Sequence, residues 1–218
     1  MLELNAVIFD MDGLMINSER VTFEGYQLVM RKLGLSISED FYKQLLGKTL
    51  PTAYQIFYNE YGDDFPMEQV LNDVHQYMAD LFDQEGVPLK KGLLELLIYL
   101  KENNYKTIVA TSSTRKRVDH ILGLADIIKY FDDSICGDEV THGKPHPEVF
   151  LRACEKLGVN PSDAIVLEDS EAGIQAAYSG NIDVICIPDM KYPEQEFEKM
   201  TTKILDSLDQ VIDFLTCS

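Results

Sequence analysis

The chain is poor in basic residues: it has 19 lysines and arginines against 37 aspartates and glutamates, a formal net charge of −18 at pH 7. A surface of this sign repels nucleic acid and anionic membranes, so we expect neither as a partner. No apolar run approaches the roughly 20 residues that span a bilayer. The first four residues, M-L-E-L, also lack the basic start and long apolar segment of a signal peptide.

Cysteine is scarce and dispersed. The four cysteines form no Cys-x-x-Cys pair, and no metal-site spacing joins them to the four histidines. Such thiols are typical of a reducing compartment, so we expect a cytoplasmic protein. The sequence also has no G-x-G dinucleotide fingerprint, no internal repeat and no low-complexity tract. Its 218 residues, 45% hydrophobic and 26% charged, suit one large domain or a core with a smaller appendage.

Short apolar runs rich in β-branched residues recur along the chain, and most precede a turn and then a helix-like segment. The expected strands are 6–9, 107–111, 134–136, 164–167 and 184–187. The expected helices are 93–102, 115–122, 147–157, 172–179 and 208–214. This alternation is typical of βαβ units. We therefore predict an α/β fold with a Rossmann-like parallel sheet at its core.

The interval from about Ser18 to Gly86 breaks that rhythm. It shows apolar residues at three- and four-residue spacing, without a convincing buried strand. We interpret it as a cap of about four helices inserted after the first strand. The predicted domains are then a core of residues 1–16 plus 87–218 and a cap of residues 17–86. The alternative is that these helices simply pack on the sheet.

The most informative motif is V-I-F-D-M-D-G at residues 7–13, an apolar run that ends in two aspartates one residue apart. Residues i and i+2 of a strand share a face, so both carboxylates can leave one strand end close together. Their repulsion is costly unless a cation or a shared proton relieves it, and Mg²⁺ takes oxygen ligands. Asp10 is thus a candidate metal-bound nucleophile and Asp12 a candidate proton carrier. A polar turn after a buried strand would use the same residues.

Two further motifs bring hydroxyl and ammonium groups. The apolar run 108–110 ends in three hydroxyl residues, Thr111, Ser112 and Ser113, just before a predicted helix. Hydroxyls and backbone N–H groups at such a place hold phosphate oxygens. An ordinary helix cap is the alternative there. In G-K-P-H-P, residues 143–147, two prolines stiffen the backbone around Lys144. An ammonium fixed in this way can neutralise a phosphoryl group and a nearby carboxylate, whereas the alternative is a solvated lysine before a helix.

The fourth motif is acidic again. The run 165–167 ends in Glu168 and Asp169. Asp169 is a candidate oxygen ligand for a metal held by Asp10, and Glu168 either ligates the metal as well or supports a ligand from behind. Alternatively, both acids favour the N-terminus of the next helix. Because parallel strands end on one edge of an open sheet, where ligands bind, the four motifs are expected to converge.

With these residues in this order, the sequence resembles the haloacid dehalogenase superfamily, in the branch with an α-helical cap after the first strand. The four motif positions are filled by Asp10-x-Asp12-Gly, Thr111, Lys144 and Glu168-Asp169. Phosphatase-type members carry a second aspartate where Asp12 stands. The motifs at 143–147 and 167–173 are similar to those of the β-phosphoglucomutase-like and sugar- or nucleoside-monophosphate phosphatase group. The likeness covers nearly the whole chain.

The resemblance implies a Mg²⁺-dependent phosphomonoester hydrolase for a small phosphorylated metabolite, a sugar phosphate or a nucleoside monophosphate. By resemblance, Asp10 attacks phosphorus and forms an aspartyl-phosphate, while Asp12 protonates the leaving alcohol and later activates water. The implied ligands of Mg²⁺ are Asp10, the Asp12 backbone carbonyl, Asp169 and, as a further candidate, Glu168. The implied contacts to phosphate and substrate are Thr111, Ser112, Lys144 and Lys48. We expect a monomer.

The main alternative is a phosphomutase that uses the same aspartyl-phosphate. Sugar phosphomutases of this group carry a histidine at the start of the cap, where this chain has Thr22, and an arginine in a cap loop, near Leu50 here. Lys48 compensates only in part, so these departures favour hydrolysis. The loop 47–52 should select the substrate. A phosphate-binding protein without catalytic activity is a second alternative, which the complete motif set disfavours.

Overall fold

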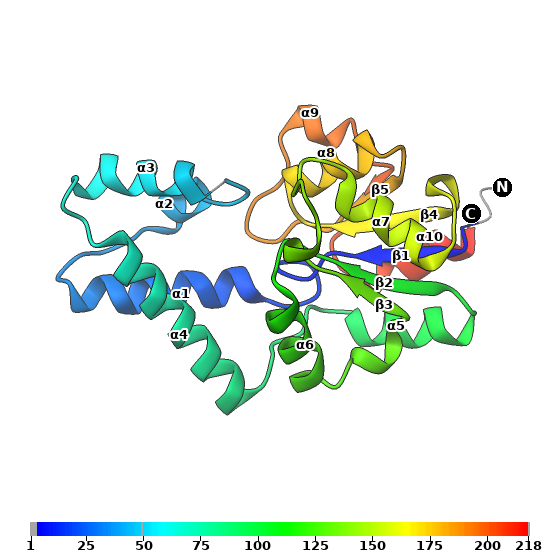
Figure 1. Cartoon of the computed structure of the whole chain (residues 1–218), viewed down its shortest axis with the longest axis horizontal. Coiled ribbons are helices and arrows are strands. Elements are labelled where there is room, and N and C mark those ends of the chain that lie inside the picture. Colours follow the sequence, from blue (N-terminus) through cyan, green and yellow to red (C-terminus); the bar gives the residue numbers. More distant parts are fainter. Residues whose placement is uncertain (1–3, 49, 218) are drawn as a thin grey trace. The chain divides into compact units, whose positions relative to one another are not determined.

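A computed structural model describes residues 4–48 and 50–217, so the first three residues and Thr49 of the predicted substrate loop lie outside it. Six strands of the described residues form one parallel sheet, in the order β3-β2-β1-β4-β5-β6 (Figure 1). The strands are β1 Ala6–Phe9, β2 Lys106–Ala110, β3 Asp133–Ile135, β4 Ala164–Glu168, β5 Asp183–Cys186 and β6 Lys203–Ile204. This is the strand order of a doubly wound Rossmann sheet, which confirms the predicted fold class.

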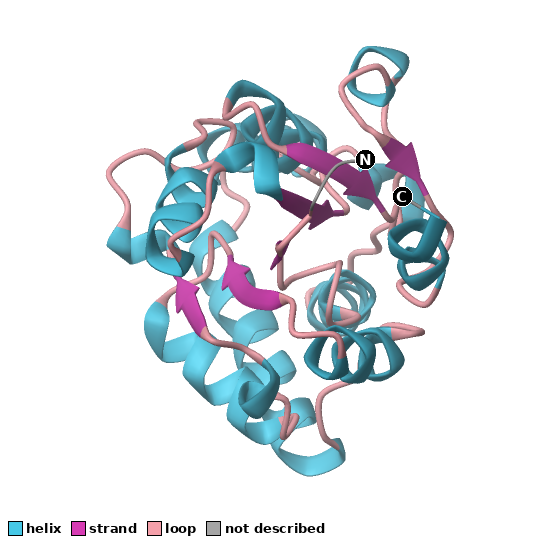
Figure 2. Cartoon of the chain, turned by 90° about the vertical axis from the view of Figure 1, so that its right-hand side faces the viewer, coloured by secondary structure: helices cyan, strands magenta, loops and turns pink. Residues whose placement is uncertain are grey.

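Helices connect the strands and lie on both sides of the sheet (Figure 2). They are α5 Leu93–Glu102, α6 Arg115–Leu124, α7 Glu148–Leu157, α8 Glu171–Ser179, α9 Gln195–Glu198 and α10 Gln210–Cys217. The predicted segments for α5 to α8 and α10 agree with these bounds to within three residues. The short elements β6 and α9 were not predicted, because two to four residues carry too little periodicity to be read from the sequence.

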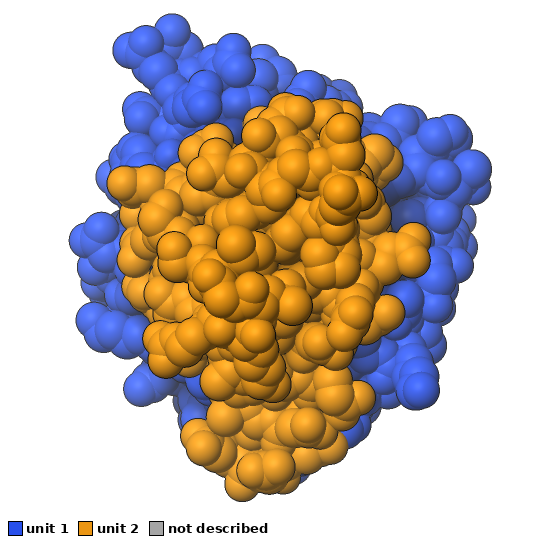
Figure 3. All heavy atoms as spheres, turned by 90° about the vertical axis from the view of Figure 1, so that its left-hand side faces the viewer, with its two compact units in different colours: residues 1–17, 87–218 blue, residues 18–86 orange. Residues whose placement is uncertain are grey.

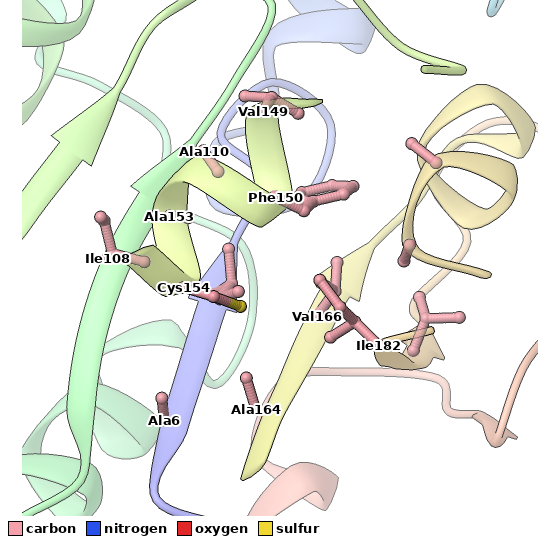
Figure 4. Close-up of a cluster of buried hydrophobic side chains, with 14 of the residues drawn as sticks. Ala6, Ile108, Ala110, Val149, Phe150, Ala153, Cys154, Ala164, Val166 and Ile182 are labelled. Carbon is pink, nitrogen blue, oxygen red and sulfur yellow. The ribbon is translucent and has the colours of Figure 1, made fainter. Parts of the chain in front are cut away.

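One cluster of buried side chains packs α7 and α8 against one face of the sheet. Alternate residues of each strand share a face, so Ile8 of β1 and Val166 of β4 point into the same layer. Phe150 and Cys154 of α7 meet them there (Figure 4). All four strand and helix positions are fully or almost fully buried. This layer holds β1 and β4 rigidly side by side, and their carboxyl ends carry the acidic motifs.

The chain divides into two compact units, Met1–Asn17 with Val87–Ser218, and Ser18–Gly86 (Figure 3). The second unit is helical in its described residues, with α1 Ser18–Lys32, α2 Glu39–Lys43, α3 Leu50–Tyr61 and α4 Met67–Glu85. Within it α1 packs on α4, and Gly25 allows the close approach: a Cβ atom there would lie 3.0 Å from Tyr77. No helix among the described residues is long and apolar enough to cross a membrane.

Candidate active site at the carboxyl edge of the sheet

The centre of the site is the side-chain ammonium of Lys144, which lies between two carboxylates. Its Nζ is 2.5 Å from Oδ1 of Asp10, just after β1, and 2.6 Å from Oε1 of Glu168, the last residue of β4. The three side chains are only 5%, 9% and 1% exposed. The ring of Phe150 in α7 lies 4.7 Å from the same nitrogen. The G-K-P-H-P segment thus places the Lys144 ammonium at the point where β1 and β4 end.

Burial and charge act against each other in this cluster. Burial raises the pKa of Asp10 above its usual value; the Lys144 ammonium opposes that rise, and the Glu168 carboxylate adds to it. Burial also disfavours the charged form of Lys144, but the carboxylates of Asp10 and Glu168 outweigh it and raise the pKa of the lysine. Two carboxylates therefore share a single positive charge. The centre is short of positive charge, a shortage that a divalent cation would relieve.

Glu168 is held from both sides. Its Oε1 accepts a hydrogen bond from the Lys144 ammonium. Its Oε2 accepts three more, from the backbone N–H of Asp169 at 2.9 Å and from the backbone N–H and the hydroxyl of Ser170 at 2.8 and 2.9 Å. Ser170 is also the N-cap of α8, and its hydroxyl oxygen accepts a hydrogen bond from the backbone N–H of Gly173. A Cβ atom on Gly173 would lie only 1.8 Å from Glu168 Oε1. The glutamate therefore needs a glycine in the first turn of α8.

Asp169 is the second acid beyond β4, and it lies against the turn after β1. A Cβ atom on Gly13 would be 2.2 Å from Asp169 Oδ2, and Gly13 has a φ of +83°, which favours glycine. Ligand atoms of Asp10, Glu168 and Asp169 lie within 4.8 Å of one another. The donors are all carboxylate oxygens, the set that suits Mg²⁺. The donor chemistry thus fits a magnesium ion, and Gly13 lets the Asp169 carboxylate approach the turn after β1.

Asp12 has two partners on the other side of the site. Its Oδ2 accepts the hydroxyl hydrogen of Ser113 at 2.7 Å, and its Oδ1 pairs with the guanidinium of Arg117 on α6, also at 2.7 Å. Neither partner was predicted from the sequence. The run R-K-R at residues 115–117, unusual in so acidic a chain, was the available signal. The two contacts hold the Asp12 carboxylate in one orientation beside the strand ends.

The hydroxyl motif follows β2, the neighbour of β1. Thr111 is buried, and its Oγ1 accepts the backbone N–H of Ser113 at 3.1 Å. A hydroxyl that accepts in this way keeps its own hydrogen for another acceptor. Ser112 is exposed. The structure therefore places Thr111, Ser112 and Ser113 in the turn between β2 and α6, beside the turn that carries the two aspartates.

Of the residues predicted for the site, seven belong to the first unit and lie at the carboxyl ends of β1, β2 and β4 or in the turn before α7. They are Asp10, Asp12, Thr111, Ser112, Lys144, Glu168 and Asp169. Lys48 belongs to the second unit, where it is exposed in the segment between α2 and α3. The sequence therefore identified the charged centre, but not the two groups that orient Asp12.

Comparison with known proteins agrees with the motifs. Residues 7–187 match the family of haloacid dehalogenase-like hydrolases. A phosphorylated carbohydrates phosphatase of Thermotoga maritima is 33% identical over 182 residues, which are 84% of this chain and 84% of that protein. Hexitol phosphatase B of Escherichia coli is 29% identical over 187 residues, or 85% and 84% of the two chains. The resemblance inferred from the sequence is confirmed.

Solved structures share the fold over nearly the whole chain. The crystal structure of a β-phosphoglucomutase from Clostridium difficile superposes with a TM-score of 0.75 and 25% identity, covering 98% of this chain and 96% of that one. CbbY of Rhodobacter sphaeroides, solved in complex with phosphate, superposes with a TM-score of 0.77 at 22% identity, covering 95% and 96%. Both phosphatases and a mutase are therefore among the proteins similar to this chain.

The contact between Gly173 and Glu168 gives a first prediction. Gly173→Ala should destabilise the protein by roughly 1–3 kcal/mol, because the new methyl group overpacks a buried carboxylate. The measurement is the free energy of unfolding in urea. Gly123→Ala is the matched control: it also lies in a helix, and no heavy atom lies within 4 Å of its Cβ position. The free energy of unfolding of the control should rise by about 0.5–1 kcal/mol, because alanine has a higher helix propensity than glycine. Equal stability of the two variants would contradict the packing described here.

Proposed function

Because the chain belongs to the haloacid dehalogenase-like hydrolases, we propose that it is a Mg²⁺-dependent phosphatase of small phosphorylated metabolites. The observation that carries the proposal is the Lys144 ammonium held between Asp10 and Glu168 at adjacent strand ends. Two of the similar proteins are named for phosphorylated carbohydrates or hexitols. These names make a sugar phosphate the first substrate to test, with a nucleoside monophosphate as the alternative.

The first half of the reaction uses Asp10 as nucleophile. Its carboxylate oxygen forms a bond to phosphorus, and the bond from phosphorus to the substrate alcohol breaks. A carboxylate needs positioning and charge neutralisation more than deprotonation, and Lys144 at 2.5 Å supplies both. The leaving alcohol oxygen takes a proton from Asp12. The products of this step are a free alcohol and an aspartyl-phosphate.

The second half uses water. Asp12, now ionised, accepts a proton as a water oxygen forms a bond to phosphorus, and the bond between phosphorus and Asp10 breaks. Inorganic phosphate leaves, and both aspartates return to their initial states. The contacts from Ser113 and Arg117 support this assignment, because an acid–base group must be aimed at the reacting oxygen. Arg117 is thus proposed as a positioning residue for Asp12.

The carboxylates of Asp10 and Asp169 are proposed to hold Mg²⁺ together with the Asp12 backbone carbonyl. When bound, the ion supplies charge neutralisation and polarises a phosphoryl oxygen. Glu168 is assigned differently, because its carboxylate already accepts four hydrogen bonds, one from Lys144, one from Asp169 and two from Ser170. These donors occupy its roughly four lone-pair sites. We propose that Glu168 fixes the position of the Lys144 ammonium beside the metal site and does not ligate the ion directly.

The phosphoryl oxygens are proposed to meet Lys144, Thr111 and the backbone around Ser112. The Thr111 hydroxyl keeps a hydrogen to donate, and backbone N–H groups near the start of α6 favour an anion. These groups would hold the three equatorial oxygens as charge spreads over them in the transition state. This arrangement also explains how so acidic a chain can bind phosphate, because the positive groups are concentrated at the reacting centre.

The helical unit 18–86 is proposed to act as an inserted cap that sets substrate specificity. Lys48 is its candidate substrate contact, because its exposed ammonium can bind an anion. Two features of this unit favour hydrolysis over mutase activity. The Thr22 hydroxyl is committed to the Ser18 carbonyl at 2.8 Å, and Leu50 is an exposed apolar side chain. Neither can grip a second phosphate group as a cationic side chain would.

The proposal predicts that Asp10→Asn lowers phosphatase activity toward sugar phosphates about a thousandfold or more, because an amide cannot form the aspartyl-phosphate. The assay is phosphate release with Mg²⁺. Asp183→Asn is the matched control, since Asp183 begins β5 at the opposite edge of the sheet, where it accepts the Thr202 hydroxyl hydrogen at 2.8 Å. It should keep most of the activity even if it lowers stability. Near-normal turnover by pure Asp10→Asn protein would refute the nucleophile assignment.

The acid–base role of Asp12 predicts a dependence on the leaving group. Asp12→Asn should slow release of phosphate from a sugar phosphate by roughly 10²–10⁴-fold, and much less from p-nitrophenyl phosphate, whose leaving group needs no proton. The measurement is kcat with both substrates. Asp119→Asn, which removes a carboxylate paired with Arg115 on the outer face of α6, is the control. Equal losses with both substrates would instead indicate a structural or metal-binding role for the Asp12 side chain.

The same site can support a mutase, and a competition experiment separates the two activities. The protein is incubated with β-glucose 1-phosphate, Mg²⁺ and glucose 1,6-bisphosphate, and glucose 6-phosphate is quantified against free phosphate. We expect phosphate release to dominate, since Thr22 and Leu50 provide no charge to retain a bisphosphate. Isomerisation about tenfold faster than release, a difference of roughly 1.4 kcal/mol between the two barriers, would establish the mutase instead.

A further inference from the structure

The segment from Thr141 to Glu148 gathers two imidazoles and a carboxylate that the phosphatase reaction does not use. Ligand atoms of His142, His146 and Glu148 lie within 4.8 Å of one another, and the two imidazole rings are 4.7 Å apart at 35°. We propose that these three residues form a second metal site, for a divalent transition metal such as Zn²⁺. It is built from residues other than the carboxylates of the catalytic centre.

The spacing of the donor atoms supports the proposal. His142 Nδ1 lies 3.1 Å from Glu148 Oε2. Zinc binds imidazole nitrogen and carboxylate oxygen at about 2.0–2.2 Å, so two ligand atoms of a tetrahedral site are about 3.4 Å apart. The hydrogen-bonded pair is therefore already close to the separation that a shared metal requires. A ligating Nδ1 carries no hydrogen, so on binding any proton there moves to Nε2 or to solvent, and the metal accepts lone pairs from both atoms.

The carboxylate of Glu148 is already fixed in place. Its Oε1 accepts the backbone N–H of Thr141 at 2.8 Å, and its Oε2 accepts the N–H of His142 at 2.9 Å. A carboxylate offers about four lone-pair sites, so these contacts leave room for a metal. Hydrogen bonds of this kind orient a ligating group and limit what it loses on binding. Glu148 is therefore prepared as a ligand before any metal arrives.

The third ligand, His146, is held by fewer contacts. It is exposed, and its Nδ1 accepts the backbone N–H of Glu148 at 3.2 Å. Turning the imidazole toward a metal breaks only this long hydrogen bond, while Pro145 and Pro147 keep the backbone on either side in place. Exposure of both histidines leaves an open path for the ion. A water molecule can complete the coordination, as in zinc sites with three protein ligands.

The donor types separate this site from the catalytic one. Two imidazoles and one carboxylate suit Zn²⁺, Ni²⁺ or Cu²⁺, whereas Mg²⁺ prefers oxygen ligands alone. The net charge of −18 concentrates cations near the surface. The two histidines of the proposed site flank Lys144 in the sequence, because His142 lies two residues before it and His146 two residues after it. A metal bound to both histidines would therefore link the two ends of the segment 142–146, which carries the Lys144 ammonium.

The test is calorimetric titration of untagged, full-length protein with Zn²⁺ in the presence of excess Mg²⁺. The wild type should bind one Zn²⁺ ion, and its thermal midpoint should rise, because the assembled site binds the ion more tightly than the unfolded chain does. His146→Ala and Glu148→Gln should each weaken this binding by at least about tenfold. His120→Ala, which removes an exposed histidine from α6, is the matched control and should bind Zn²⁺ as the wild type does.

A reciprocal variant separates the two centres. Asp169→Asn alters the carboxylate cluster, so Zn²⁺ binding that survives in this variant but is lost in His146→Ala belongs to the proposed site. Imidazole NMR signals of the wild-type protein give a measurement that needs no variant. Substoichiometric Zn²⁺ should perturb His142 and His146 and spare His75 and His120. Binding that is unchanged in His146→Ala, or signals that shift for none or for all four histidines, would overturn the proposal.

Discussion

The ammonium of Lys144 lies between two buried carboxylates, and the remainder of the site depends on this contact. Burying an isolated charge costs several kcal/mol, so each member of the cluster requires the others. Asp10 and Glu168 lie at the ends of neighbouring strands, and only a cation delivered from a third segment can join them. The cluster is still short of positive charge, and this shortage makes a divalent cation a natural further component.

Sheet topology explains why these groups meet. In the order β3-β2-β1-β4-β5-β6 the chain reverses direction across the sheet between β1 and β4, and ligands bind at such a reversal. Asp10 and Glu168 end those two strands, while Thr111 follows β2 on the other side of β1. Two glycines make the close approach possible. Gly13 leaves space for the Asp169 carboxylate, and Gly173 leaves space for Glu168.

The distribution of charge resolves an apparent conflict in the composition. The chain carries a large negative charge, yet phosphate is its proposed ligand. Lys144 lies between the Asp10 and Glu168 carboxylates, and Arg117 lies beside Asp12. Charge at short range in a buried site acts far more strongly than the screened charge of the outer surface. Local placement therefore decides the charge that a bound phosphate would meet, whereas the net charge describes the outer surface.

The sequence by itself determined the α/β class, the positions of most strands and helices, and the charged residues of the centre, because these are local patterns. Apolar runs of four or five residues that end in acids or hydroxyls are visible without a structure, as at Ala6–Phe9 and Asp10. The tertiary structure alone decided how those residues pair. That Glu168 faces Lys144 and that Arg117 holds Asp12 depend on contacts between residues 24 and 105 positions apart in the chain. No local pattern encodes such pairings, since they arise only when the strands align in register and the helices pack on them.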